Sequence, residues 1–174
     1  MSKKRSVRAC VAGLVFACAL VSASSMATQA DTGGATITVG SAPYGVTINP
    51  AGTFAYVTNS GDGTVSKIDL ATDTVVATIT VGSSPYCRVA IDPAGTFAYV
   101  ANAGPGTVSK INLATDTVVA TITGFSYPIC VVVNSDETFA YVTNLLGDTV
   151  SKIDLATDTV VDTITVGSGP TGVA

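Results

Sequence analysis

The chain contains no histidine, and its four cysteines are the residues best suited to covalent chemistry. Without an imidazole, a histidine-containing catalytic triad, a histidine metal site and histidine acid–base catalysis are all excluded. Two cysteines lie near the N-terminus, and only Cys87 and Cys130 lie in the body of the chain. Two thiols fall short of the four ligands that a structural zinc site uses. The sequence therefore predicts no metal and no cofactor, and it favours a noncatalytic protein over an enzyme.

A second group of residues is suited to binding. Aromatic side chains lie beside the prolines of three similar segments, and Arg88 follows one of these segments closely. A guanidinium binds carboxylate or phosphate through paired hydrogen bonds, and aromatic rings offer flat apolar surface. The predicted binding residues are Tyr44, Tyr86, Arg88, Phe125 and Tyr127. The alternative is that the rings pack inside the fold and that Arg88 fills a one-residue insertion.

Cys87 and Cys130 occupy equivalent positions in two of these segments, each two residues after a proline. A disulfide needs Cα atoms within about 7 Å of each other, whereas sheets that pack face to face lie about 10 Å apart. Inner strands of a repeat array converge toward its axis, which shortens that distance. The sequence alone leaves open whether the two cysteines are bridged.

These residues belong to a unit that occurs three times. Phe-Ala-Tyr-Val begins at Phe54, Phe97 and Phe139, and each copy is followed by Thr-Val-Ser-Lys-Ile and then by Leu-Ala-Thr-Asp-Thr-Val-Val. A β-rich unit of roughly forty residues in tandem is typical of a propeller or solenoid. We predict an all-β fold, a β-propeller built of four-stranded antiparallel blades. The predicted blades span about 41–81, 83–123 and 125–166.

The strand count is too small for a closed ring, because known propellers have at least about four blades. An outer strand over 35–39 and a partial inner strand over 169–174 flank the three complete blades. We therefore expect an open arc, and we favour a truncated propeller. A subunit completed by other chains and a short arc stabilised by a partner are the alternatives. Open sheet edges would also favour self-association.

The segments Tyr56-Val-Thr-Asn59 and Tyr141-Val-Thr-Asn144, with Tyr99-Val-Ala-Asn102 as a variant, resemble the YVTN repeat. The resemblance extends over 35–174 and implies a β-propeller of the YncE and archaeal surface-layer type. Proteins similar to these are exported or lie at the cell surface. Related propellers include lactonases and quinoprotein-like subunits, so a fragment or subunit of such an enzyme is the alternative function. A shared fold does not supply one activity.

Residues 1–30 are predicted to be a secretory signal peptide. Basic residues within 3–8 precede an uncharged apolar run over 9–23, which is shorter than the roughly twenty residues that span a bilayer. Cleavage after Ala27 or Ala30 would leave the repeats over 31–174 without a stable membrane span. An uncleaved N-terminal anchor is the alternative. The expected location is secreted, periplasmic or at the cell surface, in a bacterium.

Charge narrows the class of partner. Four of the eight Lys and Arg residues lie in the predicted signal peptide, whereas none of the twelve Asp and Glu residues does. The remaining chain is strongly acidic, which opposes binding to nucleic acid or anionic lipid. We expect an exported binding or scaffold module whose partner at the cell envelope is protein or glycan.

A lysine recurs at one position of each repeat, at Lys67, Lys110 and Lys152. Asp69 and Asp154 follow two residues later on the same predicted strands. Because residues two apart on a strand point to the same face, we expect these lysines to be compensated locally by the neighbouring aspartates. The alternative is that the three lysines form a basic stripe for an acidic ligand.

Overall fold

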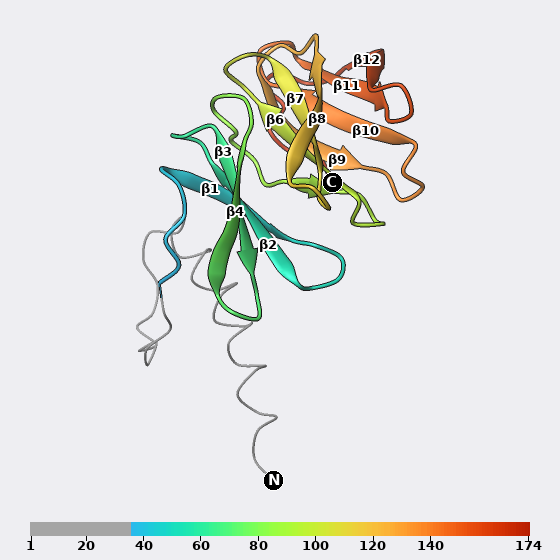
Figure 1. The fold of residues 1–174 in the computed structure, drawn as a ribbon. Coiled ribbons are helices and arrows are strands. Elements are labelled where there is room, and N and C mark those ends of the chain that lie inside the picture. The colour runs from blue at the N-terminus through green and yellow to red at the C-terminus, as the bar shows by residue number, and fades with distance from the viewer. Residues whose placement is uncertain (1–35) are drawn as a thin grey trace, which may run out of the picture. The chain divides into compact units, whose positions relative to one another are not determined.

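The computed structural model describes residues 36–174, and every regular element in this range is a β-strand. Contacts place a boundary after Thr38, and the unit described here begins at Val39. Its twelve strands form three separate four-stranded sheets (Figure 1). No helix within 36–174 has the length and apolar character needed to cross a membrane. The predicted signal peptide lies outside the described residues.

Each sheet is an antiparallel meander in which consecutive strands are hydrogen-bonded neighbours. Blade 1 consists of β1 (Pro43–Ile48), β2 (Phe54–Asn59), β3 (Thr64–Asp69) and β4 (Thr74–Thr80). Blade 2 consists of β5 (Ala90–Ile91), β6 (Phe97–Asn102), β7 (Thr107–Asn112) and β8 (Thr117–Thr123). Blade 3 consists of β9 (Pro128–Val133), β10 (Phe139–Asn144), β11 (Thr149–Asp154) and β12 (Thr159–Thr165). The prediction of an all-β fold with four-stranded antiparallel blades is confirmed.

The turn between the third and fourth strands is the same in every blade. In blade 1, Asp69 Oδ1 accepts hydrogen bonds from the N–H groups of Ala71 at 2.7 Å and Thr72 at 3.2 Å. Asp73 then adopts a left-handed backbone with a φ of 55°, a conformation that aspartate tolerates better than most residues. Asn112 and Asp154 accept the equivalent bonds in blades 2 and 3. The repeated sequence therefore builds a repeated turn.

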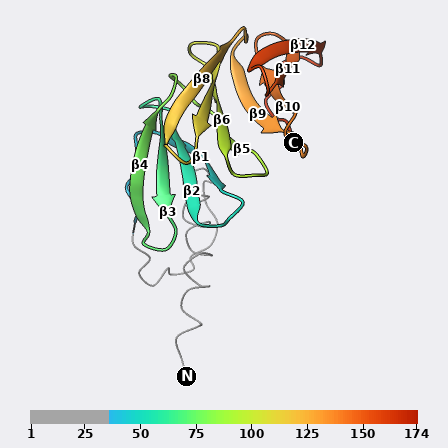
Figure 2. The same cartoon turned by 45° about the vertical axis from the view of Figure 1, so that its right-hand side comes forward.

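Neighbouring blades share an apolar core, which explains why the second strand of each repeat is apolar on both faces. Between blades 1 and 2, the buried side chains are those of Tyr56, Val65, Ile79, Val89, Ala98, Val100, Ile111 and Leu113. Between blades 2 and 3, they are those of Tyr99, Val108, Ile122, Phe125, Val131, Ala140, Val142 and Ile153. Blade 2 thus lies between the other two blades (Figure 2). The three sheets do not close into a ring.

Two segments expected to be strands are not strands. Residues 36–39 and 169–174 pair with no described strand, and a strand exists only through such pairing. Strand β5 is also shorter than expected, with two residues where β1 and β9 have six. Its segment carries one residue more than the other two, and this extra residue precludes regular pairing with β6 before Ala90.

Candidate functional site

A groove of about 760 Å³ lies where residues of the three blades converge. Four of the five predicted binding residues line it. They come from the segments that precede or begin the first strand of each blade, and they are Tyr44, Tyr86, Arg88 and Tyr127. The segments that lead into each blade, here called links, begin at Ser41, Ser83 and Phe125 and differ in sequence. The links therefore meet at one place in the fold, as expected for the end of a repeat array at which binding residues vary.

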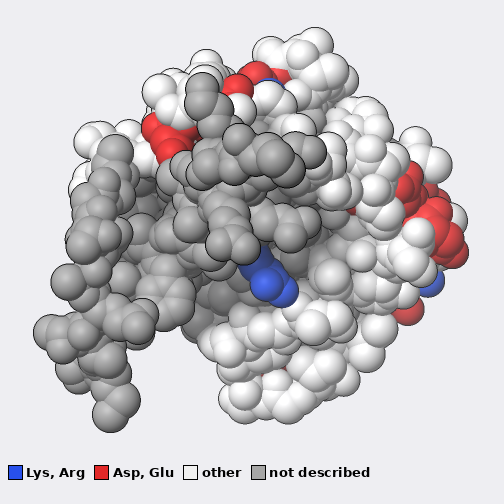
Figure 3. Space-filling view, turned by 90° about the horizontal axis from the view of Figure 1, so that it is seen from below, with Lys and Arg blue, Asp and Glu red and all other residues white. Residues whose placement is uncertain are grey.

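Arg88 supplies the positive charge of the groove. It is the only arginine within residues 36–174, and its side chain is exposed. It forms no ion pair or hydrogen bond with any residue in that range. Figure 3 shows a face of the molecule on which uncharged residues prevail and basic side chains are few. Within residues 36–174, the guanidinium of Arg88 therefore has no carboxylate that neutralises its charge.

The aromatic rings differ in how they are held. Tyr44 is 63% exposed, and its ring contacts that of Tyr86 edge to face, with centroids 5.8 Å apart and planes at 67°. Tyr127 has a left-handed backbone with a φ of 57°, which is uncommon for a bulky residue. The same conformation occurs at the smaller Ala42 and Ser84 of the other links. Tyr127 comes directly before the proline of its link, whereas Tyr44 and Tyr86 come directly after theirs.

Phe125, the fifth predicted residue, does not line the groove. Its side chain is buried in the core between blades 2 and 3, where it packs with Tyr99 and Val131. Phe125 is among the predicted binding residues because it lies in the same link as Tyr127. An uncharged ring without a polar group is stabilised more by burial than by exposure at a groove, which is the physical reason for its different placement.

Cys87 and Cys130 form a disulfide that lines the groove and joins blade 2 to blade 3. Their Cα atoms are 5.3 Å apart, well below the spacing of two packed sheets, because the inner segments converge. A similar approach occurs between blades 1 and 2. A Cβ atom on Gly45 would lie 2.6 Å from the Cα atom of Arg88, so only glycine fits there.

The lysines of blades 1 and 2 reach across to the following blade, which corrects the expectation of local compensation. Lys67 Nζ lies 2.8 Å from Asp116 Oδ1 in blade 2, and Lys110 Nζ lies 2.7 Å from Asp158 Oδ1 in blade 3. The expected partner Asp69 instead accepts hydrogen bonds within its own turn. The signal that was missed is the aspartate that recurs in each turn between the third and fourth strands.

Two buried tyrosines, which lie near the aspartates of these ion pairs, have raised pKa values. Burial raises the pKa of Tyr56 to about 12, and the negative charge of Asp116 adds to the effect. Burial likewise raises the pKa of Tyr99, with Asp158 as the next cause. Both phenols therefore stay neutral at physiological pH, and neither is suited to act as a base.

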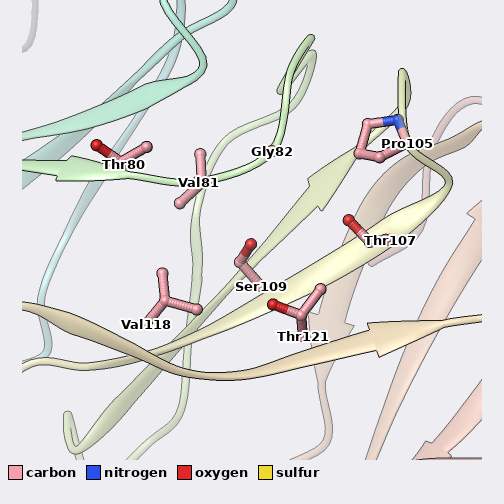
Figure 4. A pocket seen from close by; sticks show the side chains of 8 residues that line it. All are labelled: Thr80, Val81, Gly82, Pro105, Thr107, Ser109, Val118 and Thr121. Carbon is pink, nitrogen blue, oxygen red and sulfur yellow. The ribbon is translucent and has the colours of Figure 1, made fainter.

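A smaller cavity of about 270 Å³ lies between the segment Val81–Gly82 and the strands β7 and β8. Its polar lining consists of hydroxyl groups, among them those of Thr107, Ser109 and Thr121 (Figure 4). No charged side chain lines it. Within residues 36–174 there is also no cluster of three residues that could hold a metal ion. Among the described residues, the groove around Arg88 is the better candidate for a functional site.

No family model matches the chain, and no curated protein matches it. Among solved structures, hydrazine synthase from Kuenenia stuttgartiensis superposes with a TM-score of 0.71 and 24% identity, covering 83% of this chain and 41% of that one. The structure of U3-55K and the WD40 repeats of RRP9 each superpose with a TM-score of 0.67 and 13% identity, covering 74% of this chain and 40% of theirs.

These similarities show the fold. The chain is a β-propeller protein, and it spans about two fifths of the length of the propeller-containing chains to which it is similar. More particularly, residues 39–174 form an open array of three four-stranded blades.

Proposed function

We propose that this chain is an exported β-propeller module of the YVTN and YncE-like type, which binds protein or glycan at the cell envelope without catalysis. The observation that carries the proposal is the groove in which Arg88, with no partner within 36–174, lies among three tyrosines. Its ligand would carry a carboxylate beside an apolar or ring-shaped surface. The guanidinium would donate hydrogen bonds to the carboxylate, and the rings would pack against the adjoining surface.

The disulfide supports the exported location in this proposal. Disulfides persist in secreted and periplasmic proteins and are rare in a reducing cytosol. The bond between Cys87 and Cys130 therefore agrees with the predicted signal peptide at 1–30. A secreted, periplasmic or cell-surface location would place the groove where envelope proteins and glycans are found.

Self-association is a further part of the proposal. Each blade leaves its outer strand, β4, β8 or β12, unpaired on one side among the described residues. Unpaired edges present N–H and C=O groups to which another strand can bind. A scaffold role would use such contacts to assemble several copies or to join this chain to another propeller.

Binding by purified protein to arrays of glycans and peptides would test the groove. We expect selectivity for members with one free carboxylate over matched neutral glycans and amidated peptides. Arg88→Gln should weaken that binding at least tenfold, because it removes the charged donor. Lys152→Gln, which changes net charge equally at a position outside the groove, is the matched control.

The outcomes are distinguishable. Retention of full binding by Arg88→Gln, or an equal loss in the Lys152→Gln control, would contradict the proposed site. The same would hold if no carboxylate-bearing ligand bound in either array. Tyr44→Ala should weaken binding without changing thermal stability, because the side chain of Tyr44 is largely exposed.

A further inference from the structure

Blades 1 and 2 each present one face toward the next blade, and this face and its equivalent in blade 3 are here called the leading face. In every blade, the leading face carries a tyrosine, a valine, a lysine and an isoleucine at equivalent positions. In blade 3 these residues are Tyr141, Val150, Lys152 and Ile164. The leading faces of blades 1 and 2 are covered by the following blade, so that Ile79 is 3% exposed and Ile122 is 4% exposed. Ile164 is 45% exposed, so the leading face of blade 3 is open.

The lysine on this open face lacks the partner that its counterparts have. Lys67 and Lys110 each pair with an aspartate from the turn of the following blade. Lys152 forms no ion pair within residues 36–174, and its Nζ atom lies 3.7 Å from the centre of the Phe139 ring. The positive charge of Lys152 on this sheet face is thus not neutralised by an ion pair within the described residues.

Blade 3 differs from the other blades at one residue of its outer strand, and this residue lies on the open face. The strands β4 and β8 both read Thr-Val-Val-Ala-Thr-Ile-Thr, whereas β12 reads Thr-Val-Val-Asp-Thr-Ile-Thr. The changed residue, Asp162, is the cross-strand partner of Lys152, as Ala77 is of Lys67. Partners across an antiparallel pair point to the same face of a sheet. The open face therefore carries one cation and one anion side by side.

We infer that the leading face of blade 3 binds the same face of a second copy of this chain. A two-fold axis between Lys152 and Asp162 would place each lysine opposite the other copy's aspartate. Such a surface is self-complementary, as the interface of a symmetric dimer must be. The same axis would place Val150 of each copy opposite Ile164 of the other, because these two residues are also cross-strand partners, and the contact would cover both. The second copy's Asp162 would thus supply the carboxylate that the following blade supplies to Lys67 and Lys110.

The size of the face sets the expected strength. Six residues at about 3.3 Å each and the two overlapping strands β11 and β12 at about 4.8 Å each give a contact of roughly 200 Å². Stable interfaces bury about 800 Å² of accessible surface on each partner. The dimer should therefore be weak, with a dissociation constant in the micromolar range or above. It gives the proposed self-association a defined surface, and it is independent of the groove around Arg88.

Sedimentation velocity of the purified chain, at concentrations from about ten to several hundred micromolar, would test the inference. The unchanged protein should show a reversible monomer–dimer equilibrium. Lys152→Glu and Asp162→Lys should each weaken the dimer at least tenfold, because each places two like charges on the face. Mixing the two variants should restore association as a mixed dimer, since the charges become complementary again.

Circular dichroism and thermal unfolding would establish that both variants remain folded. Asp136→Lys, which makes the same charge change on a turn away from this face, should leave the dimer unaffected. The inference is overturned if the unchanged protein is monomeric throughout, or if the single variants associate as strongly as it does. It is also overturned if the mixture stays monomeric, as a lysine and aspartate that pair only within one copy would require. None of these results would alter ligand binding in the groove.

Discussion

Lys67 shows how one side chain joins two blades. Its Nζ atom contacts both carboxylate oxygens of Asp116, at 2.8 and 3.0 Å, and the carbonyl oxygen of Leu113 at 3.3 Å. It also lies 4.4 Å from the centre of the Phe54 ring, within the range of a cation–π contact. Because the lysine is buried, the loss of its charged partner is more costly than the loss of an exposed one.

Asp116→Asn should therefore lower the free energy of unfolding by about 1–3 kcal/mol. Asp69→Asn is a matched control, because Asn112 forms the equivalent turn in blade 2, and its effect should stay within about 0.5 kcal/mol. Urea unfolding of the two variants would measure both values. Equal losses of stability would show that the ion pair from Lys67 to the following blade contributes no more to the free energy of unfolding than the turn hydrogen bonds of Asp69 do.

At the scale of elements, the disulfide connects the segment before β5 to strand β9. It closes a loop between cysteines separated by 43 positions, so it restricts the unfolded chain considerably. Strand β5 has only two residues and makes correspondingly few ladder hydrogen bonds. The disulfide therefore holds a segment that the sheet itself holds weakly, and it does so beside Arg88.

Reduction of the disulfide should lower the free energy of unfolding by about 4 kcal/mol according to the loop-entropy relation. The double substitution Cys87→Ser and Cys130→Ser should have a similar effect without reductant. Urea unfolding of oxidised and reduced protein would give the difference, and the double variant should not respond to reductant. A loss below about 1 kcal/mol would mean that the inner segments are held by packing alone.

At the scale of the whole molecule, the two buried tyrosines predict how stability depends on alkaline pH. The pKa of Tyr56 is raised to about 12 from its ordinary value of 10.0, so the folded protein holds this proton more tightly than the unfolded chain does. The resulting stabilisation is complete below pH 10 and is lost as pH rises from about 10 to about 12. Tyr99 acts in the same direction.

Urea unfolding at several values between pH 9 and pH 12 should therefore show a falling free energy of unfolding. The slope should not exceed about 1.4 kcal/mol per pH unit for each tyrosine. Tyr56→Phe should reduce this slope, and the double variant with Tyr99→Phe should reduce it further. An unchanged slope in the double variant would show that other groups cause the alkaline loss of stability.

The repeat made much of this fold predictable from sequence, since Phe-Ala-Tyr-Val and its neighbours recur with the same apolar alternation and the same turns. The approach of four predicted binding residues could be anticipated because the segments that carry them are equivalent in each blade. The roles of Phe125 and Lys67 could not, because each depends on a side chain meeting the adjacent blade. Strand pairing and turns are local, whereas contacts between blades require the spacing and rotation of whole sheets.

The ion pairs of Lys67 and Lys110 with the turn of the following blade also affect how a gene of this kind can gain further blades. In blade 2, Asp116 forms an ion pair with the lysine of the preceding blade, and Lys110 forms one with the turn of the following blade. A DNA segment that encodes one blade therefore encodes both the lysine and the aspartate of the ion pair that connects neighbouring blades. Tandem duplication of that segment yields neighbours that already match, with no compensating mutation. The identical outer strands of blades 1 and 2 are what lengthening by such copying would leave behind.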